Sequence, residues 1–405
     1  MPKYSFTAKS LEGEEQSGIT EATNIQALAK TLKQQGFILI KAEPTKEKKE
    51  KRLKLSLSFL ESVSLTEKMM FTRNLQVMIA SGLPLPRALN TLSEQAKSQK
   101  LKKALLDIRE KVVKGKNFSE TLEDHPDIFS ELFRNMIKVG EESGTLEKVL
   151  TVLTKQMERE HELKSKITGA LMYPAVIILA MVGIGILMLV MVVPQLGETF
   201  EELGIELPVT TQLVIGIGTF MAERWYFAIL IMIALIFFLW TFSKTKTGKK
   251  TIDTLILKLP VISALAKKTN SAYTVRTLSS LITAGIPIVR SLEITAGVLG
   301  NIYYKEAIME AAEKVKKGGK LSEALKKHKD IYPLVVFQMV EVGEETGESS
   351  EILARLADFF EDEVGNATKN LASVIEPVLM IIIGAVIGFF AISMVQPMYS
   401  MLGAF

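Results

Sequence analysis

The sequence predicts a mainly α-helical integral membrane protein, with two repeated cytoplasmic helical bundles of about six helices each, three transmembrane helices and a small N-terminal α+β domain. Three observations lead to this fold class. The mean hydropathy is +0.23 although 23% of the residues are charged, so the apolar residues must be concentrated in a few segments. A long part of the chain is repeated at a constant spacing of 203 residues. The first 45 residues follow a different pattern, with alternation around one amphipathic segment.

Three segments without charges account for the mean hydropathy. They lie between Lys166 and Glu198, at residues 225–243, and after Glu376 up to Phe405. At 1.5 Å per residue, the 19 residues of the second segment span roughly 28 Å, close to the ~30 Å of a hydrocarbon core. We predict transmembrane helices at 171–193, 225–243 and 377–398. The alternative is buried helices of a large soluble core.

The charges that flank these segments predict the orientation. Lys155, Arg159, Lys164 and Lys166 precede the first span, and four lysines at 244–250 follow the second. The intervening loop carries Glu198, Glu201, Glu202 and Glu206 and no base before Arg224. Because Lys and Arg concentrate on the cytoplasmic side, both bundles are expected in the cytoplasm, and the loop and the C-terminus outside. Residues 210–222 are also apolar, and either extend the second span or lie along the membrane surface.

The N-terminal residues 1–43 predict a small α+β domain. Residues 4–22 alternate, with Gly13 in a hairpin turn, residues 24–37 form an amphipathic helix ended by Gly36, and residues 38–44 form a strand. This gives the order β-β-α-β. A basic linker, 44–64, follows. It is expected to be solvated, with contact to anionic lipid headgroups as the alternative.

The repeat covers two units and their following membrane helices. Residues 81–85 (SGLPL) correspond to 284–288 (AGIPI), and 139–144 (VGEESG) to 342–347 (VGEETG). The same spacing relates Arg73 to Arg276, Leu89 to Leu292, His125 to His328, Pro174 to Pro377 and Pro194 to Pro397. Because no gap is needed, both units should share one fold. They imply a pseudo-two-fold relation or at least two equivalent surfaces.

Each unit is expected to be helical. Phe71, Leu75, Met78 and Ile79 recur at helical spacing before Gly82, which ends the helix, as Gly285 does in the second unit. Four further apolar stripes follow before the Gly140 turn, one of them a short helix capped by Asn117. A last helix then starts near Leu146 and continues into the membrane. The expected organisation is 1–43, 44–64, 65–170, 171–193, 194–224, 225–243, 244–376 and 377–398.

Composition and motifs exclude several function classes. Lys and Arg number 49 and Asp and Glu 45, and residues 41–54 alone carry the net excess of +4, which argues against a broadly basic nucleic-acid binder. Cysteine is absent, which excludes disulfides, Cys-ligated metals and a Cys nucleophile. The N-terminus has no apolar core typical of a signal peptide. The motifs of P-loop nucleotide sites, HExxH zinc sites and GxSxG hydrolases do not occur. His125 and His328 are expected to be structural or exposed.

The motif G-E-E-[ST]-G occurs at 140–144 and 343–347. Its glycines predict tight turns with positive φ between two helices, in which Ser143 or Thr346 caps the following helix. Partner docking through exposed carboxylates is compatible with such turns, and Ca²⁺ binding is an alternative. The candidate docking residues are Glu141, Glu142, Glu344 and Glu345. The candidate structural glycines are Gly82, Gly140, Gly144, Gly285, Gly343 and Gly347.

The membrane helices carry a few further candidates. Glu376 stands before Pro377 at the cytoplasmic edge of the third span, where the first unit has Tyr173 before Pro174. A carboxylate at this depth is a functional candidate, although contact with headgroup water or a neighbouring helix is the favoured explanation. Gly384 and Gly388 form a G-x-x-x-G motif, a candidate close helix–helix contact.

Taken in order, these motifs resemble a known family. The segments beginning at Phe71 and Thr274, the V-G-E-E-[ST]-G turns at Val139 and Val342, and K-I-T-G-A-L-M-Y-P from Lys166 resemble the inner-membrane platform proteins of type IV pilus assembly and type II secretion, the PilC/GspF family. The resemblance covers essentially the whole chain. Thr274, in place of the first unit's Phe71, is a minor departure.

The resemblance implies a non-enzymatic platform in the cell inner membrane, with its bulk facing the cytoplasm. Such platforms anchor a cytoplasmic hexameric assembly ATPase and recruit pilin or pseudopilin subunits, alongside other inner-membrane assembly proteins. We expect type IV pilus assembly, with a type II secretion or competence pseudopilus platform as the alternative. A homo-oligomer without cofactor, metal or nucleic acid is expected. A transporter or channel subunit and a membrane-bound enzyme are the competing classes.

Overall fold

The computed structural model describes residues 3–10, 15–44, 62–202, 207–260 and 262–402. These fall into two parts, residues 1–61 and 62–405, each of which is described by itself. The expected hairpin turn at Gly13, the linker over 45–61 and the C-terminal Phe405 lie outside the described residues.

The N-terminal part is the expected ββαβ domain. Strands β1 (Lys3–Ser10), β2 (Glu15–Glu21) and β3 (Phe37–Pro44) form an antiparallel sheet in the order β2-β1-β3, with α1 (Ile25–Gln34) between the last two. Asn24 caps α1 by accepting a hydrogen bond from the Ala27 amide at 2.7 Å. The small core joins Phe6 and Ala8 of β1 to Leu28 and Leu32 of α1.

The second part contains two equivalent repeats of six helices each. The first repeat comprises α2 (Leu65–Ala80), α3 (Leu85–Gln95), α4 (Gln99–Val113), α5 (Phe118–Glu123), α6 (Glu131–Glu142) and α7 (Leu146–Leu187). The second repeat comprises α12 (Ile262–Thr283), α13 (Ile288–Val298), α14 (Ile302–Lys316), α15 (Leu321–Lys326), α16 (Leu334–Thr346) and α17 (Ser349–Leu402). Helices α13 to α17 each begin 203 residues after their counterparts α3 to α7. The expected helix count and common fold are confirmed.

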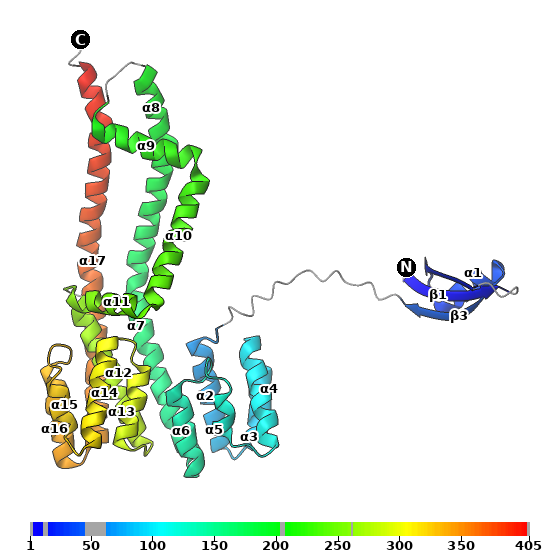
Figure 1. Cartoon of the computed structure of the whole chain (residues 1–405), viewed down its shortest axis with the longest axis horizontal. Helices are drawn as coiled ribbons and strands as arrows, with labels where there is room; N and C mark the ends of the chain where they lie inside the picture. The colour runs from blue at the N-terminus through cyan, green and yellow to red at the C-terminus, as the bar shows by residue number, and fades with distance from the viewer. Residues whose placement is uncertain (1–2, 11–14, 45–61, 203–206, 261, 403–405) are drawn as a thin grey trace. The chain divides into compact units, whose positions relative to one another are not determined.

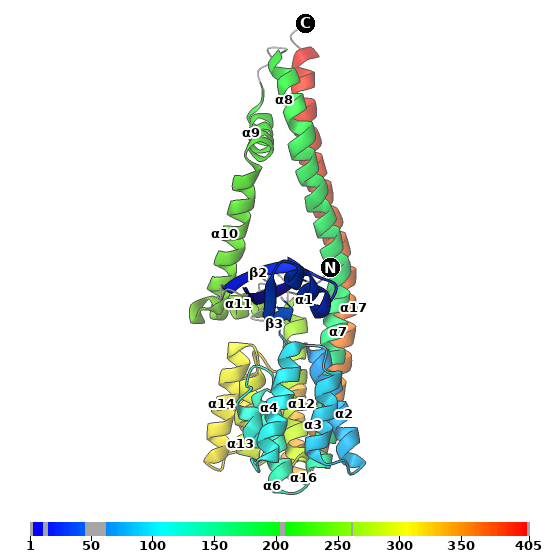
Figure 2. The same cartoon turned by 90° about the vertical axis from the view of Figure 1, so that its right-hand side faces the viewer.

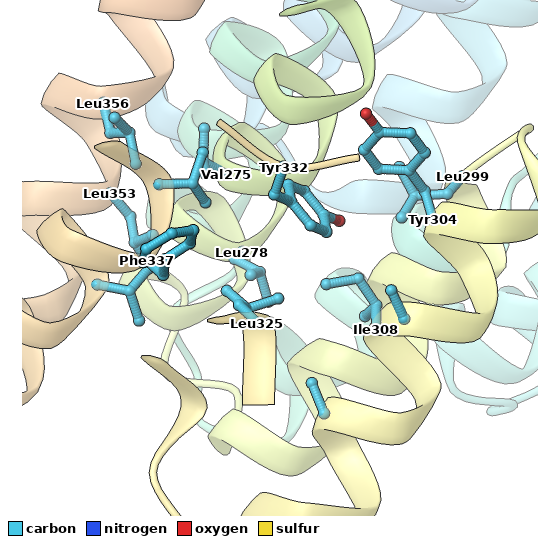
Figure 3. Close-up of a cluster of buried hydrophobic side chains, with 14 of the residues drawn as sticks. Val275, Leu278, Leu299, Tyr304, Ile308, Leu325, Tyr332, Phe337, Leu353 and Leu356 are labelled. Atoms are coloured by element: carbon cyan, nitrogen blue, oxygen red, sulfur yellow. The ribbon is translucent and has the colours of Figure 1, made fainter. Parts of the chain in front are cut away.

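Each repeat has its own apolar core. In the first, the rings of Phe71, Phe129 and Phe133 pack at tilted angles with centroids 5.2 to 6.5 Å apart. In the second, Tyr304 and Tyr332 meet edge to face at 4.8 Å among Val275, Leu278, Ile308 and Leu325 (Figure 3). The two tyrosine hydroxyls are satisfied, because Tyr304 donates to the Ile331 carbonyl at 2.6 Å and Tyr332 pairs with Thr274 at 3.0 Å. Gly82 and Gly285 end α2 and α12 with φ of 78° and 87°.

In the described part of the chain, three helices are long and apolar enough to cross a membrane. Helix α7 runs on through a π-helical turn (Met188–Val192) into α8 (Val193–Glu202), α10 spans Trp225–Lys244, and α17 continues out of the second repeat. In the most apolar stretch of each helix, only 6%, 0% and 11% is buried within the structure. Their side chains therefore face an apolar surrounding, as lipid would provide.

Two further helices were not predicted as separate elements. Residues 210–222 belong to α9 (Val209–Glu223), which does not simply extend α10, because the backbone breaks at Arg224. Helix α9 packs against α17, where the buried Thr211 hydroxyl donates to the Ser393 carbonyl at 2.6 Å. Helix α11 (Lys246–Lys258) precedes the second repeat and holds it through Asp253, which accepts a hydrogen bond from the Ile302 amide at the start of α14.

The two repeats lie side by side, and α7 and α17 leave their bundles in the same direction (Figures 1 and 2). Helices α6 and α7 of the first repeat contact α12, α13 and α17 of the second. Equivalent helices therefore play different roles in this contact. The relation is head to tail, and not the pseudo-two-fold relation that was one of the two expectations.

Candidate functional site

The two G-E-E-[ST]-G segments connect α6 to α7 and α16 to α17. In the first, Gly144 has φ of +68°, and the Thr145 amide donates to the Gly140 carbonyl at 2.8 Å, which closes the end of α6. In the second, Gly347 has φ of +75°. The expectation of positive φ is thus met by the second glycine of each motif only.

Gly140 and Gly343 are needed for a different reason. Both are buried within helices, without positive φ. A Cβ atom on Gly140 would lie 3.0 Å from Val149 Cβ and 3.1 Å from Leu146 Cα, and one on Gly343 would lie 3.1 Å from Ser349 Cα. These glycines let two consecutive helices approach closely. The prediction of a left-handed turn residue at these positions was wrong, because helical spacing continues through them.

The expected caps also differ. Ser143 is the C-terminal cap of α6, and its hydroxyl donates to the Val139 carbonyl at 2.6 Å, while Thr145 is the residue before α7. Thr346 is the last residue of α16, and its hydroxyl donates to the Val342 carbonyl at 2.9 Å. Both hydroxyls therefore donate to the helix that ends. Thr346 also accepts a hydrogen bond from the Glu348 amide at 3.3 Å, just before α17, and the Ser143 hydroxyl lies 2.7 Å from that of Thr145. Asn117 precedes α5 as expected, but its side chain makes no capping hydrogen bond.

The first glutamate of each pair supplies the cap that Asn117 lacks. Glu141 accepts hydrogen bonds from the Phe118 amide at 2.6 Å, the Ser119 amide at 2.9 Å and the Ser119 hydroxyl at 2.6 Å. Glu344 accepts three equivalent bonds, at 2.5 to 3.1 Å, from Leu321 and Ser322 at the start of α15. A carboxylate there satisfies amides that have no partner within the short helix. Sequence reasoning missed this role because 22 residues separate the partners.

The second glutamate of each pair, Glu142 or Glu345, is exposed. Beside Glu142, a shallow polar hollow is lined by Glu120, Glu123, Lys138 and Asn117. A hollow at the second turn is instead lined mainly by apolar side chains, among them Ile282, Ile288, Met339 and Leu353. The two turns thus have the same glycine conformation and an exposed carboxylate, but one borders a polar hollow and the other a mainly apolar one. In the described part of the chain, no group of three or more His, Asp or Glu side chains could hold a metal ion.

The repeated histidines contact acids of the neighbouring helix. His125 Nε2 lies 2.8 Å from Asp107 Oδ2, and His328 Nε2 lies 3.2 Å from Glu310 at the equivalent position. Hydrogen bonds from Lys111 and His125 hold the pKa of Asp107 below its ordinary value. These contacts join α4 to the loop after α5, and α14 to the loop after α15, which fits the structural role expected of the histidines.

The candidates at the membrane helices differ in burial in the described part of the chain. Pro174 is buried within α7, whereas Glu376 and Pro377 on α17 are exposed. A Cβ atom added to Gly384 or Gly388 would meet nothing within 4 Å. The G-x-x-x-G segment therefore makes no close helix contact among the described residues.

Comparison with known proteins agrees with this architecture. The family described as type II secretion system (T2SS) protein F matches residues 71–194 and 274–397, the two repeats with their membrane helices, and its N-terminal domain family matches residues 1–43. A type IV pilus assembly protein PilC from Thermus thermophilus is 34% identical, covering 100% of this chain and 99% of its own length. A PilC from Myxococcus xanthus is 33% identical over 99% of this chain and 95% of its own length.

A type II secretion system protein F from Vibrio cholerae is 29% identical over 99% of this chain and 98% of its own length. The family match covers both repeats at the same 203-residue spacing as the helices. This chain therefore belongs to the PilC/GspF family, the protein F family of type II secretion and type IV pilus assembly.

Proposed function

We propose that this protein is an inner-membrane platform that couples a cytoplasmic assembly ATPase to the assembly of pilin subunits. Family membership supports a role in secretion or pilus machinery. Among the relatives, the two PilC proteins above are somewhat more similar than the Vibrio cholerae protein F, which favours a type IV pilus. A type II secretion or competence pseudopilus is the second candidate, in which pseudopilins take the place of pilins.

The observation that carries the proposal is the continuity of α7 and α17. Each begins at an acidic turn and continues without interruption into an apolar, membrane-length segment. A force applied at Glu142 or Glu345 would therefore reach the membrane through a continuous rod. The other inner-membrane assembly proteins and the pilins would contact the exposed apolar faces of the spans.

We also propose that both repeats lie in the cytoplasm. Lysines 244, 246, 249 and 250 follow α10, and glutamates 198, 201 and 202 lie in the connection between the first two spans. A reporter enzyme that is active only in the periplasm should be silent when fused at Gly248 and active when fused after Phe405. Activity at Gly248 would contradict the orientation.

The docking experiment separates the two glutamates of each pair. Glu142→Gln with Glu345→Gln removes two exposed charges and leaves the α5 and α15 caps intact. We expect weaker co-purification of the ATPase, with less dependence on salt, because exposed charges contribute mainly to association rate and specificity. Glu306→Gln with Glu313→Gln removes two exposed charges from α14 and is the matched control. If both double variants bind the ATPase like the unaltered protein, the docking surface lies elsewhere.

A further inference from the structure

The first repeat uses one face in the contact between the repeats, and the second repeat uses a different one. Each repeat therefore has a further face that corresponds to the one used by the other repeat and that is not covered among the described residues. From the second repeat, Leu281, Ile286 and Ile294 are buried in the core of the first. The buried Ser280 hydroxyl donates to Gln156 of α7 at 2.7 Å, and Arg290 pairs with Glu131 of α6 at 3.2 Å. Among the described residues, helices α2 and α3, the counterparts of α12 and α13, make no comparable contact with the second repeat.

The equivalent positions identify the two unused faces. We call the positions that correspond to the second repeat's half of the contact the receiving face: Met70, Arg73, Val77, Lys155 and Glu158 on α2 and α7. We call those that correspond to the first repeat's half the presenting face: Leu334, Phe359 and Asp362 on α16 and α17. On these faces Met70 and Val77 are 50% and 57% exposed, and Phe359 and Leu334 are 49% and 61% exposed. Large apolar side chains exposed at positions that form an interface elsewhere in the chain indicate an uncompleted contact.

At one central pair of positions, the two unused faces complement each other in polarity. Inside the chain, the central pair is polar on both sides, Ser280 against Gln156. At the equivalent positions both partners are apolar, Val77 against Phe359. Val77 and Phe359 differ from Ser280 and Gln156 in the same sense, so neither of these two would bury a polar group without a partner. Arg87 and Leu334 are the counterparts of Arg290 and Glu131, so that ion pair is not repeated on the unused faces.

The charges are complementary too, with their signs exchanged. Inside the chain, Arg159 of the first repeat lies 3.9 Å from Glu361, which together with Asp358 binds Arg276 at 2.7 and 2.5 Å. One positive charge therefore meets a group with a net negative charge.

At the equivalent positions the presenting face carries Asp362. The receiving face carries Arg73, Lys155 and Glu158, with Arg73 3.9 Å from Glu158. One negative charge would meet a group with a net positive charge, so the attraction is retained.

We propose that the presenting face of one copy of this protein docks on the receiving face of a second copy. The contact would repeat between chains the head-to-tail step that the chain already makes between its repeats. Because α7 and α17 leave their bundles in the same direction, this step would leave these spans of both copies in one membrane (Figure 1). A head-to-tail contact closes into a ring or continues as an open array, and is distinct from a two-fold dimer. This contact between copies does not require the ATPase.

Cysteine cross-linking of the full-length protein in membranes tests the proposal, because the chain has no native cysteine. Val77→Cys and Phe359→Cys are expressed in separately tagged copies of the protein and treated with a short thiol-specific cross-linker. We expect a cross-linked product that contains one copy of each kind, and none from either variant alone. Val113→Cys, on an exposed residue of α4, replaces Val77→Cys as the negative control. Gln156→Cys with Ser280→Cys in one chain is the positive control, with an expected link within the chain.

Two outcomes would overturn the proposal. The first is a link in the positive control but none between Val77→Cys and Phe359→Cys, which would mean that something other than a second copy covers these faces. The second is a link between two Phe359→Cys copies, which would indicate a two-fold contact through α17. Charge exchange gives an independent measurement. With the cysteine pair present, Asp362→Lys should abolish the link and added Arg73→Glu with Lys155→Glu should restore it.

Discussion

Replacement of Glu141 by Gln tests whether the geometry that both acidic turns share serves helix capping. Glu141 accepts three hydrogen bonds at 2.6 to 2.9 Å from the start of α5. Glutamine keeps one acceptor oxygen and places an NH₂ group against a backbone donor, so at least one charge-assisted bond is lost. Hydrogen bonds to charged groups contribute about 1.5–3 kcal/mol each. At about 2–4 °C per kcal/mol, the midpoint of thermal unfolding should fall by about 3–12 °C.

The assay compares Glu141→Gln with Glu142→Gln in detergent-solubilised protein. Circular dichroism at increasing temperature gives the unfolding midpoint, and amide hydrogen exchange of peptides covering α5 gives the local effect. Glu142 is exposed, so its variant should change the free energy of unfolding by no more than about 0.5 kcal/mol and should shift the midpoint little. Capping of α5 by Glu141 is refuted if Glu141→Gln leaves both the unfolding midpoint and the hydrogen exchange of α5 unchanged, or if Glu142→Gln has the larger effect on them.

Three further variants test a close contact between helices, a buried hydrogen bond and an ion pair. Gly140→Ala should cost about 1–3 kcal/mol, because the new methyl group would lie 3.0 Å from Val149 Cβ, and chemical unfolding measures it; an unchanged midpoint would contradict the close approach. Tyr332→Phe removes the bond between the two buried hydroxyls, while Thr274 still donates to the Asn270 carbonyl at 2.8 Å, so the variant should cost about 0.5–1.5 kcal/mol in the same assay; a neutral result would mean that the bond contributes nothing. Asp107 has a lowered pKa, so its contribution to stability is present above its unfolded value of about 4 and is lost as the pH falls through the folded one. Asp107→Asn should therefore flatten the decrease in stability toward acid, measured as unfolding midpoint against pH; equal slopes would refute the pairing.

The sequence by itself determined the class of protein and its repeated organisation. Apolar runs of membrane length can be recognised without tertiary information, because a lipid surrounding sets a minimum length and tolerates few charges. The spacing of 203 residues predicted that both repeats have the same helices, since identical apolar patterns bury the same faces. Gly82 and Gly285 were correctly predicted to end helices, because their effect is local.

Only the tertiary structure decided which residues of the acidic turns do what. Glu141 and Glu142 are adjacent and chemically identical, and their roles differ because only Glu141 points toward the start of α5, 22 residues away along the chain. Gly140 likewise has an ordinary helical backbone and is required by the closeness of Leu146 and Val149. The direction of the contact between the repeats was also open, because a sequence repeat fixes equivalent surfaces but not which of them meet. That choice depends on side-chain complementarity across α6, α7, α12 and α13, which exists only once both repeats are folded.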